Sequence, residues 1–254
     1  MMRTTLTGLS LDELRAFVTS LGEKPYRAAQ LFSWLYARGA ASFEDMSDLS
    51  GPFRELLAQV AAPGSLQLVT ARTSSQDGTT KFLLRLADGR AIESVLIPPE
   101  SSSPDADRRL TLCMSTQVGC PLDCAFCATG TMGFTRNLTA GEIVEQFLHA
   151  QRQTSQRISN LVYMGMGEPM LNYENVMRSV DLLTDDRGPN IGARHITIST
   201  AGYADQIRRM ADEHRRVKLA LSLHALDESK RTALMPITRK HGIAALTDVL
   251  DYYY

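Results

Sequence analysis

Cys120-Pro-Leu-Asp-Cys124-Ala-Phe-Cys127 is the stretch around which the rest of the chain can be understood. Thiolates at such short spacing are the usual ligands of iron–sulfur clusters, because one loop can wrap around one cluster. Three protein ligands leave one iron of a 4Fe–4S cube open, and an open metal site is where chemistry occurs. The alternatives are a zinc site without its fourth ligand and three unrelated thiols. Zinc sites usually add a second cysteine pair, and the only other cysteine is Cys113, so the pattern favours the open cluster.

Length and composition describe an ordinary globular chain. It has 254 residues, of which 44% are hydrophobic and 22% charged, enough for a large domain with a small one beside it. No run approaches the roughly 18 apolar residues that a membrane helix needs, and the N-terminus lacks the apolar core of a signal peptide. Four cysteines, three of them in one loop, make no disulfide framework. Free thiols and an oxygen-sensitive cluster predict a location in the reducing cytoplasm.

The bulk charge gives no support for nucleic-acid binding. The formal net charge is −1 and the isoelectric point about 6.5, whereas nucleic-acid-binding domains are usually basic. Basic residues do gather locally, but each single group is better explained as a solvated helix or loop face. These groups are Arg108-Arg109, Arg208-Arg209, Arg215-Arg216 with Lys218, and Arg239-Lys240.

The N-terminal part changes from a helical to a strand-like pattern. Residues 1–62 carry apolar residues at helical spacing, beginning with the capping box Ser10-x-x-Glu13. Residues 66–98 alternate instead, with two Asp-Gly turns, which predicts a small antiparallel meander. A stretch rich in serine, proline and aspartate predicts a linker over 101–107. The predicted domains are residues 1–62, 63–107 and 108–254.

Glu93 is a carboxylate on an otherwise apolar face of the third predicted strand. It shares strand parity with Ala91, Val95 and Ile97. Burial on that face would raise the pKa of Glu93 and suit it to proton transfer. From parity alone, a glutamate at the rim or on the surface is the simpler interpretation.

From Arg109 onward, predicted strands and helices alternate. Repeated βα units build a parallel sheet, and active sites of such sheets lie at the carboxyl ends of the strands. The cysteine loop, Gly167-Glu168, Ser199 and Ser222–His224 all fall at those ends, so we expect them to lie together. The predicted strands are 110–115, 160–164, 195–200 and 217–224.

Several motifs together resemble a known family. The cysteine triplet, with Phe126 directly before its last member, resembles the radical S-adenosylmethionine (SAM) superfamily. With three further strings it resembles, over essentially the whole chain, the dual-specificity 23S rRNA and tRNA adenine-C2 methyltransferases of the RlmN type. Those strings are Thr111-Leu-Cys113-Met-Ser-Thr-Gln-Val-Gly-Cys120, Met164-Gly-Met-Gly-Glu-Pro-Met-Leu-Asn172 and Leu221-Ser-Leu-His224.

The resemblance implies a fold and a set of cofactor contacts. The fold is of the α/β class, a partial (β/α) barrel of six units preceded by a small RNA-facing helical domain and the meander. The cysteine triplet Cys120, Cys124 and Cys127 would hold a 4Fe–4S cluster whose open iron binds SAM. Glu168 would bind the ammonium group of SAM, with Gly167 beside it. Further SAM contacts are implied for Ser199, Ser222, Leu223 and His224.

Some of these residues also have simpler interpretations. Without the resemblance, Gly167-Glu168-Pro169 is a turn that ends a strand, and a lone His224 is more often structural. The resemblance assigns Glu93 as the proton acceptor. It assigns Cys113 as the partner of a second cysteine near the C-terminus, which carries the methyl group. The residue at the position of Cys113 then helps to resolve the resulting link between protein and RNA. A free cysteine such as Cys113 is otherwise more often a small core residue.

The chain departs from the family pattern at its end. Only four of six βα units are visible and no cysteine follows Cys127, so we expect a C-terminally truncated chain. The alternatives are an adenine-C8 methyltransferase of the related antibiotic-resistance type and a truncated cluster- or RNA-binding remnant without catalysis. The implied partners are 23S rRNA, tRNA and an electron donor such as flavodoxin. We expect no membrane association and a monomer.

Overall fold

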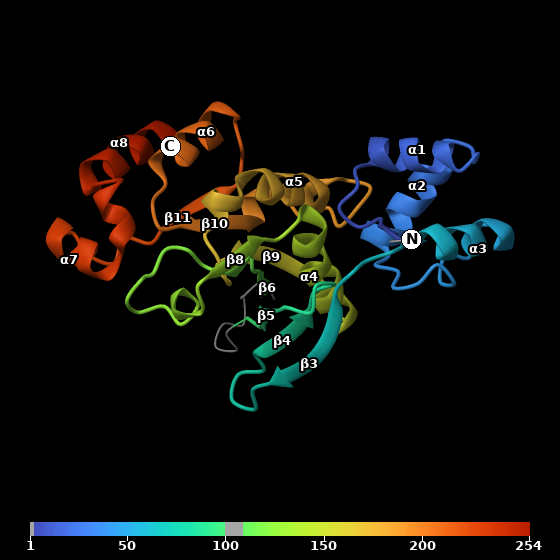
Figure 1. The fold of residues 1–254 in the computed structure, drawn as a ribbon, viewed down its shortest axis with the longest axis horizontal. Helices are drawn as coiled ribbons and strands as arrows, with labels where there is room; N and C mark the ends of the chain where they lie inside the picture. The colour runs from blue at the N-terminus through green and yellow to red at the C-terminus, as the bar shows by residue number, and fades with distance from the viewer. Residues whose placement is uncertain (1–2, 100–108) are drawn as a thin grey trace.

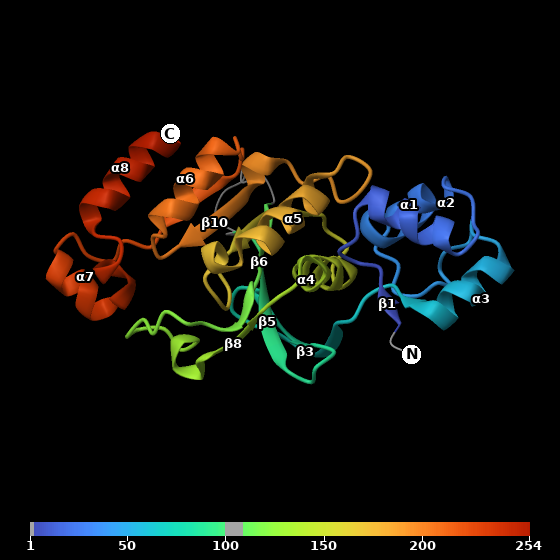
Figure 2. The same ribbon diagram turned by 45° about the horizontal axis from the view of Figure 1, so that its top comes forward.

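The computed structural model describes residues 3–99 and 109–254, so the linker predicted over 101–107 lies outside the described residues. A seven-stranded sheet of order β11-β10-β9-β6-β5-β4-β3 forms the centre (Figures 1 and 2). Its strands are β3 (Gln67–Thr73), β4 (Thr80–Arg85), β5 (Ala91–Ile97), β6 (Leu110–Cys113), β9 (Ile158–Tyr163), β10 (Ile196–Thr200) and β11 (Lys218–Leu221).

One half of the sheet is parallel. Strands β6, β9, β10 and β11 pair in parallel, and at least one α-helix follows each of these four strands before the next of the four or the end of the chain. The predicted βα alternation and α/β class are confirmed, and the sheet does not close into a barrel within the described part of the chain. The helices are α4 (Ala140–Arg152), α5 (Tyr173–Thr184), α6 (Ala204–Asp212), α7 (Glu228–Leu234) and α8 (Ile243–Tyr253).

The other half of the sheet is the predicted antiparallel meander. Gly78 and Gly89, with φ of 73° and 83°, occupy the two Asp-Gly turns between its strands. Strand β5 also pairs with β6, in the antiparallel sense. The meander is therefore continuous with the parallel half and not a separate layer.

The N-terminal residues form a helical unit that rests on α4. Within this unit, the Tyr36 hydroxyl donates to the Leu9 carbonyl and accepts from the Gly8 amide, both over 2.8 Å, and so fixes the segment that meets α4. A Cβ on Gly8 would lie 2.8 Å from the Gly141 backbone in α4, so glycine allows this close contact. The elements are β1 (Thr4–Thr5), α1 (Leu11–Ser20), α2 (Arg27–Phe32), a π-helix (Ser33–Ala37), α3 (Gly51–Val60) and β2 (Ala61–Ala62).

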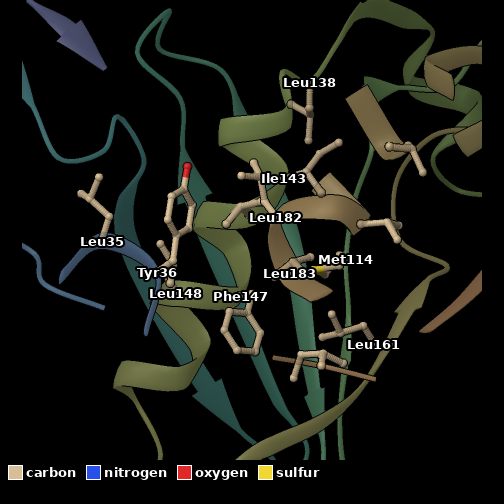
Figure 3. Close-up of a cluster of buried hydrophobic side chains, with 14 of the residues drawn as sticks. Leu35, Tyr36, Met114, Leu138, Ile143, Phe147, Leu148, Leu161, Leu182 and Leu183 are labelled. Carbon is tan, nitrogen blue, oxygen red and sulfur yellow. The ribbon is translucent and has the colours of Figure 1, made fainter. Parts of the chain in front are cut away.

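Figure 3 shows how this unit joins the core. Leu35 and Tyr36 approach Phe147 and Leu148 of α4, while Met114 comes from the end of β6. The apolar sides of the N-terminal helices, α4, α5 and the sheet thus share one core. Ser10 and Thr139 cap α1 and α4 in capping boxes, as the sequence predicts for Ser10. No helix among the described residues is long and apolar enough to cross a lipid bilayer.

Candidate active site

The three cysteines lie on a loop whose two ends are held together. Strands β7 (Gln117–Gly119) and β8 (Phe134–Asn137) pair as an antiparallel ribbon, and the Cys120 amide donates to the Gly133 carbonyl over 3.0 Å. Gly119 has a φ of 76°, and a Cβ there would lie 1.7 Å from the Gly133 oxygen. Only glycine permits this approach, so the ribbon fixes both ends of the cysteine loop, residues 120–133.

The tip of the cysteine loop contacts α7 and the residues after β11. The Ala125 amide donates to the Leu234 carbonyl over 3.0 Å. The Phe126 ring lies against the His224 ring, with centroids 4.4 Å apart and planes tilted by 46°. His224 has a φ of 59°, an uncommon left-handed conformation for a residue with a side chain. The aromatic residue of the cysteine motif therefore meets one of the predicted SAM contacts.

The thiols of Cys120, Cys124 and Cys127 are free and half-buried. Burial raises the pKa of Cys124 to about 11, with smaller contributions from the Cys120 and Cys127 thiolates and from Glu168, so these groups lie near one another. Among the described residues, no three His, Cys, Asp or Glu side chains are arranged to hold a single metal ion. Three neighbouring thiols on one fixed loop fit a 4Fe–4S cluster, which stabilises them as thiolates.

Glu168 lies after β9 and is only 3% exposed. One carboxylate oxygen accepts from the Met170 amide over 3.0 Å and the other from the Ala201 amide over 2.8 Å. Burial raises the pKa of Glu168, and these two donors act in the opposite direction. The carboxylate thus joins the carboxyl ends of β9 and β10, and its remaining lone pairs are available to a cationic ligand group.

The conformation of Gly167 is explained by a neighbouring side chain. It has a φ of 101°, and a Cβ there would lie 2.6 Å from the Cβ of Gln117. The same glutamine accepts from the Glu168 amide through its side-chain oxygen over 2.8 Å. Glycine is therefore needed for Gln117 to position Glu168, and a direct contact of Gly167 with SAM stays a prediction.

The predicted contacts on β10 and β11 lie together. The Ser199 and Ser222 hydroxyl oxygens are 3.4 Å apart. The Ser222 amide donates to the Thr200 carbonyl over 2.9 Å, which continues the strand pairing beyond β11. Leu223 and His224 follow directly, so the structure gathers this group at one end of the sheet, and its role toward SAM stays a prediction.

Arg231 is a residue of this region that sequence reasoning missed. Its side chain in α7 is fully buried, and its guanidinium donates to the Ala201, Leu223 and Thr238 oxygens over 2.6, 3.2 and 2.6 Å. Arg231 makes no ion pair with a carboxylate of the described residues. Its position one turn before the buried Met235 is the only sequence signal that it faces inward.

Glu93 is less buried than predicted. The buried side of β5 carries Ile92, Ser94 and Leu96, whereas the Glu93 side chain is 45% exposed and forms a 2.9 Å ion pair with Lys81. Glu93 is therefore not buried on the apolar face, and its position agrees with the alternative interpretation of a glutamate at the rim or on the surface. The physical reason is Ser94, which is accommodated in the core because its hydroxyl donates to the buried Gln146 side chain over 2.7 Å.

Glu93 and Cys113 nevertheless share one face of the sheet. Val95 is the direct partner of Cys113 across β5 and β6, so Glu93 is a diagonal neighbour of Cys113, at about 7–8 Å. Cys113 is half-buried, burial raises the pKa of its thiol, and the Met164 amide donates to it. The face is opposite the one that Leu110 and Leu112 bury in the core.

Comparison with known families agrees with this geometry. Residues 4–62 match the ribosomal RNA large subunit methyltransferase N-terminal domain. Residues 114–254 match the radical SAM superfamily, which covers more than half of the chain. The first match spans the helical unit. The second begins directly after β6 and contains the cysteine loop and strands β9, β10 and β11.

Curated relatives and a solved structure are similar over almost the whole chain. The probable dual-specificity RNA methyltransferase RlmN of Thermotoga neapolitana is 47% identical over 98% of this chain and 70% of its own length. The dual-specificity RNA methyltransferase RlmN of Anaeromyxobacter sp. is 44% identical over 97% of this chain and 65% of its own. A crystal structure of a radical SAM methyltransferase from Sphaerobacter thermophilus superimposes with a TM-score of 0.90 at 42% identity, covering 98% of this chain and 72% of that one. This chain therefore belongs to the radical SAM superfamily and, within it, to the RlmN family of RNA methyltransferases.

Proposed function

We propose that the protein methylates carbon 2 of adenine in 23S rRNA and tRNA, with a 4Fe–4S cluster and SAM as cofactors. The observation that carries the proposal is the contact of the cysteine loop with the residues after β11, beside Glu168. Thiols, a buried carboxylate and two hydroxyl groups thereby lie around one end of a parallel sheet, where such folds bind ligands. The similarity to RlmN proteins supports RNA as the substrate.

The cofactor contacts follow from the described side chains. Cluster and SAM together supply a 5′-deoxyadenosyl radical when they are bound. Cys120, Cys124 and Cys127 hold the cluster, and Glu168 accepts a charge-assisted hydrogen bond from the ammonium group of SAM. Gly167 gives Glu168 its position, and the group Ser199, Ser222, Leu223 and His224 lines the rest of the SAM site.

Glu93 and Cys113 serve the RNA side of the reaction. Glu93 accepts the proton that leaves adenine, and its half-exposed carboxylate, paired with Lys81, can be reached by a substrate. Cys113 would act as the thiol that resolves a link between RNA and a second, methyl-carrying cysteine, and the given sequence holds no such cysteine after Cys127. Their shared sheet face supports a joint role for the two residues.

The partners follow from the same chemistry. The helical unit of residues 1–62 contacts RNA, and the meander of 63–107 leads to the catalytic part, residues 108–254. An electron donor such as flavodoxin reduces the cluster, and the protein acts as a monomer in the cytoplasm. The match of residues 4–62 to a ribosomal RNA methyltransferase domain supports the first assignment.

A gene deletion tests the proposal. Deleting the gene that encodes this chain should remove 2-methyladenosine from both 23S rRNA and tRNA, measured by mass spectrometry of digested RNA. The intact gene should restore it, and a Cys124→Ala copy should not. Persistence of 2-methyladenosine would contradict the proposal. Loss of 8-methyladenosine instead would assign the C8 reaction.

A further inference from the structure

Basic residues stand at the start of every parallel strand, at the end of the sheet opposite the cysteine loop. They are distant in the sequence, but the strand order β11-β10-β9-β6 places them side by side. One basic residue precedes each of β6, β9 and β10, and two stand at the beginning of β11. The row, which we call the basic edge, consists of Arg109, Arg157, Arg194, Arg216 and Lys218.

The basic edge lines two adjoining hollows. The larger, of about 540 Å³, is lined by Arg157, Arg194 and Arg216. The smaller, of about 200 Å³, is lined by Arg109, Lys218 and again Arg194. Among the described residues that line either hollow there is no aspartate or glutamate. In a chain of net charge −1, this is a marked local excess of positive charge.

Within the described part of the chain, ion pairs do not neutralise Arg194 and Arg216. Arg215 shows the contrast, because it forms ion pairs with Asp181 and Glu213 over 2.6 and 3.1 Å. Its neighbour Arg216 and also Arg194 make no ion pair with any carboxylate in the described part of the chain. Unpaired cations in a hollow attract anions, and the guanidinium group matches the geometry of phosphate.

We propose that the basic edge binds the phosphodiester backbone of the RNA substrate at a distance from the reacting adenine. The inference rests on the proposed function and adds a second point of contact to it. Four strands about 4.8 Å apart span about 15 Å, which is about four phosphates at 3.4 Å along one strand. Strands of about five residues at 3.3 Å separate the two ends of the sheet by a similar distance. A folded RNA can therefore contact both ends, and a short hairpin presents fewer phosphates to the basic edge.

A double substitution tests the basic edge. Arg194→Gln with Arg216→Gln removes two cations that make no hydrogen bond to the backbone of residues 3–99 and 109–254. Arg157 stays because its guanidinium donates to the Pro189 and Asn190 carbonyls. The purified chain is titrated with full-length tRNA and with a short hairpin that carries the target adenine, at several salt concentrations. For tRNA we expect about tenfold weaker binding. The slope of the logarithm of the binding constant against the logarithm of the salt concentration should be smaller in magnitude by about one to two. Hairpin binding should change less than tRNA binding.

Matched controls make the outcome decisive. Arg72→Gln with Arg85→Gln removes two exposed arginines on β3 and β4 and should leave tRNA binding unchanged. Both double variants should have the same melting temperature as the parent chain. Lys218→Gln should give a smaller loss in the same direction. Unchanged tRNA affinity and salt slope in the first variant would overturn the proposal, as would an equal loss in the control. Binding of inorganic phosphate at the edge, with tRNA binding unaffected, would also overturn it. Failure of the proposed function is distinct, since it appears as unchanged 2-methyladenosine in the gene deletion.

Discussion

Glu168 and Arg231 bind the same residue, Ala201, through its two backbone groups. The Glu168 carboxylate accepts from the Ala201 amide over 2.8 Å, and the Arg231 guanidinium donates to the Ala201 carbonyl over 2.6 Å. Both side chains are buried, and they come from segments on either side of β10. The carboxyl end of β10 is thus held between an anion and a cation, so neither side chain is only a ligand contact.

Substitution of Glu168 should affect stability and SAM affinity in different ways. Glu168→Ala leaves two buried amides without acceptors, at about 1–3 kcal/mol each, so the free energy of unfolding should fall by about 2–6 kcal/mol. Glu168→Gln keeps one acceptor oxygen and should lose less stability. Both should lower SAM affinity about tenfold to a hundredfold, through the lost charge-assisted hydrogen bond. Calorimetric titration and thermal melts measure the two effects, and unchanged SAM affinity in both variants would show that Glu168 only ends a strand.

Substitution of Arg231 should reveal a buried hydrogen-bonding role. Arg231→Met leaves the Ala201 carbonyl and the Thr238 hydroxyl without their donor, and we expect a loss of about 3 kcal/mol in the free energy of unfolding. Lys230→Met changes the exposed neighbour in the same helix and should shift stability by less than about 0.5 kcal/mol. Urea denaturation compares the two. Equal stability of both variants would contradict a structural role for Arg231.

Removal of single cysteines should separate the cluster ligands from Cys113. The anaerobically reconstituted chain should bind about four irons and four sulfides. Alanine at Cys120, Cys124 or Cys127 should abolish this, while Cys113→Ala should keep it because Cys113 lies on the sheet and not on the loop. Iron and labile-sulfide assays measure the outcome. Stoichiometric zinc without sulfide would instead support the zinc alternative.

Glu145 should make stability depend on pH. Burial raises its pKa to about 7 from 4.5, although the Ser65 and Leu66 amides donate to it. The folded chain therefore holds a proton that the unfolded chain releases, and stability should fall as pH rises from about 4.5 to 7, by up to about 3 kcal/mol. Glu145→Gln cannot ionise and should lack this fall.

The effect of Glu145 is measured as a difference between variant and parent. His149, one turn later in α4, has its pKa lowered by burial to about 4 from 6.5, so its contribution to stability is lost as pH falls through that window. The two trends oppose each other in the parent chain, but His149 is common to both proteins and cancels. A difference in unfolding free energy that stays constant from pH 5 to 8 would contradict the raised pKa.

Local pattern was sufficient for much of the fold and for the cluster ligands. Capping boxes, Asp-Gly turns and the alternation of strand and helix act between residues close in the chain, so their structures could be predicted from spacing. The cluster ligands could also be predicted from spacing, because one loop carries all three thiols of the cysteine triplet.

Tertiary packing decided the rest. Strand parity showed that Glu93 and Ser94 point to opposite faces of the sheet, but it could not show which face is buried. That depends on α4, whose Gln146 side chain accepts the hydrogen bond from the Ser94 hydroxyl. From the sequence alone, Arg231 would be predicted to lie on the surface. Only the packing of α7 brings its side chain to the Ala201 and Leu223 carbonyls. The basic edge likewise exists only because parallel strand order brings separate segments side by side, and no local pattern encodes that order.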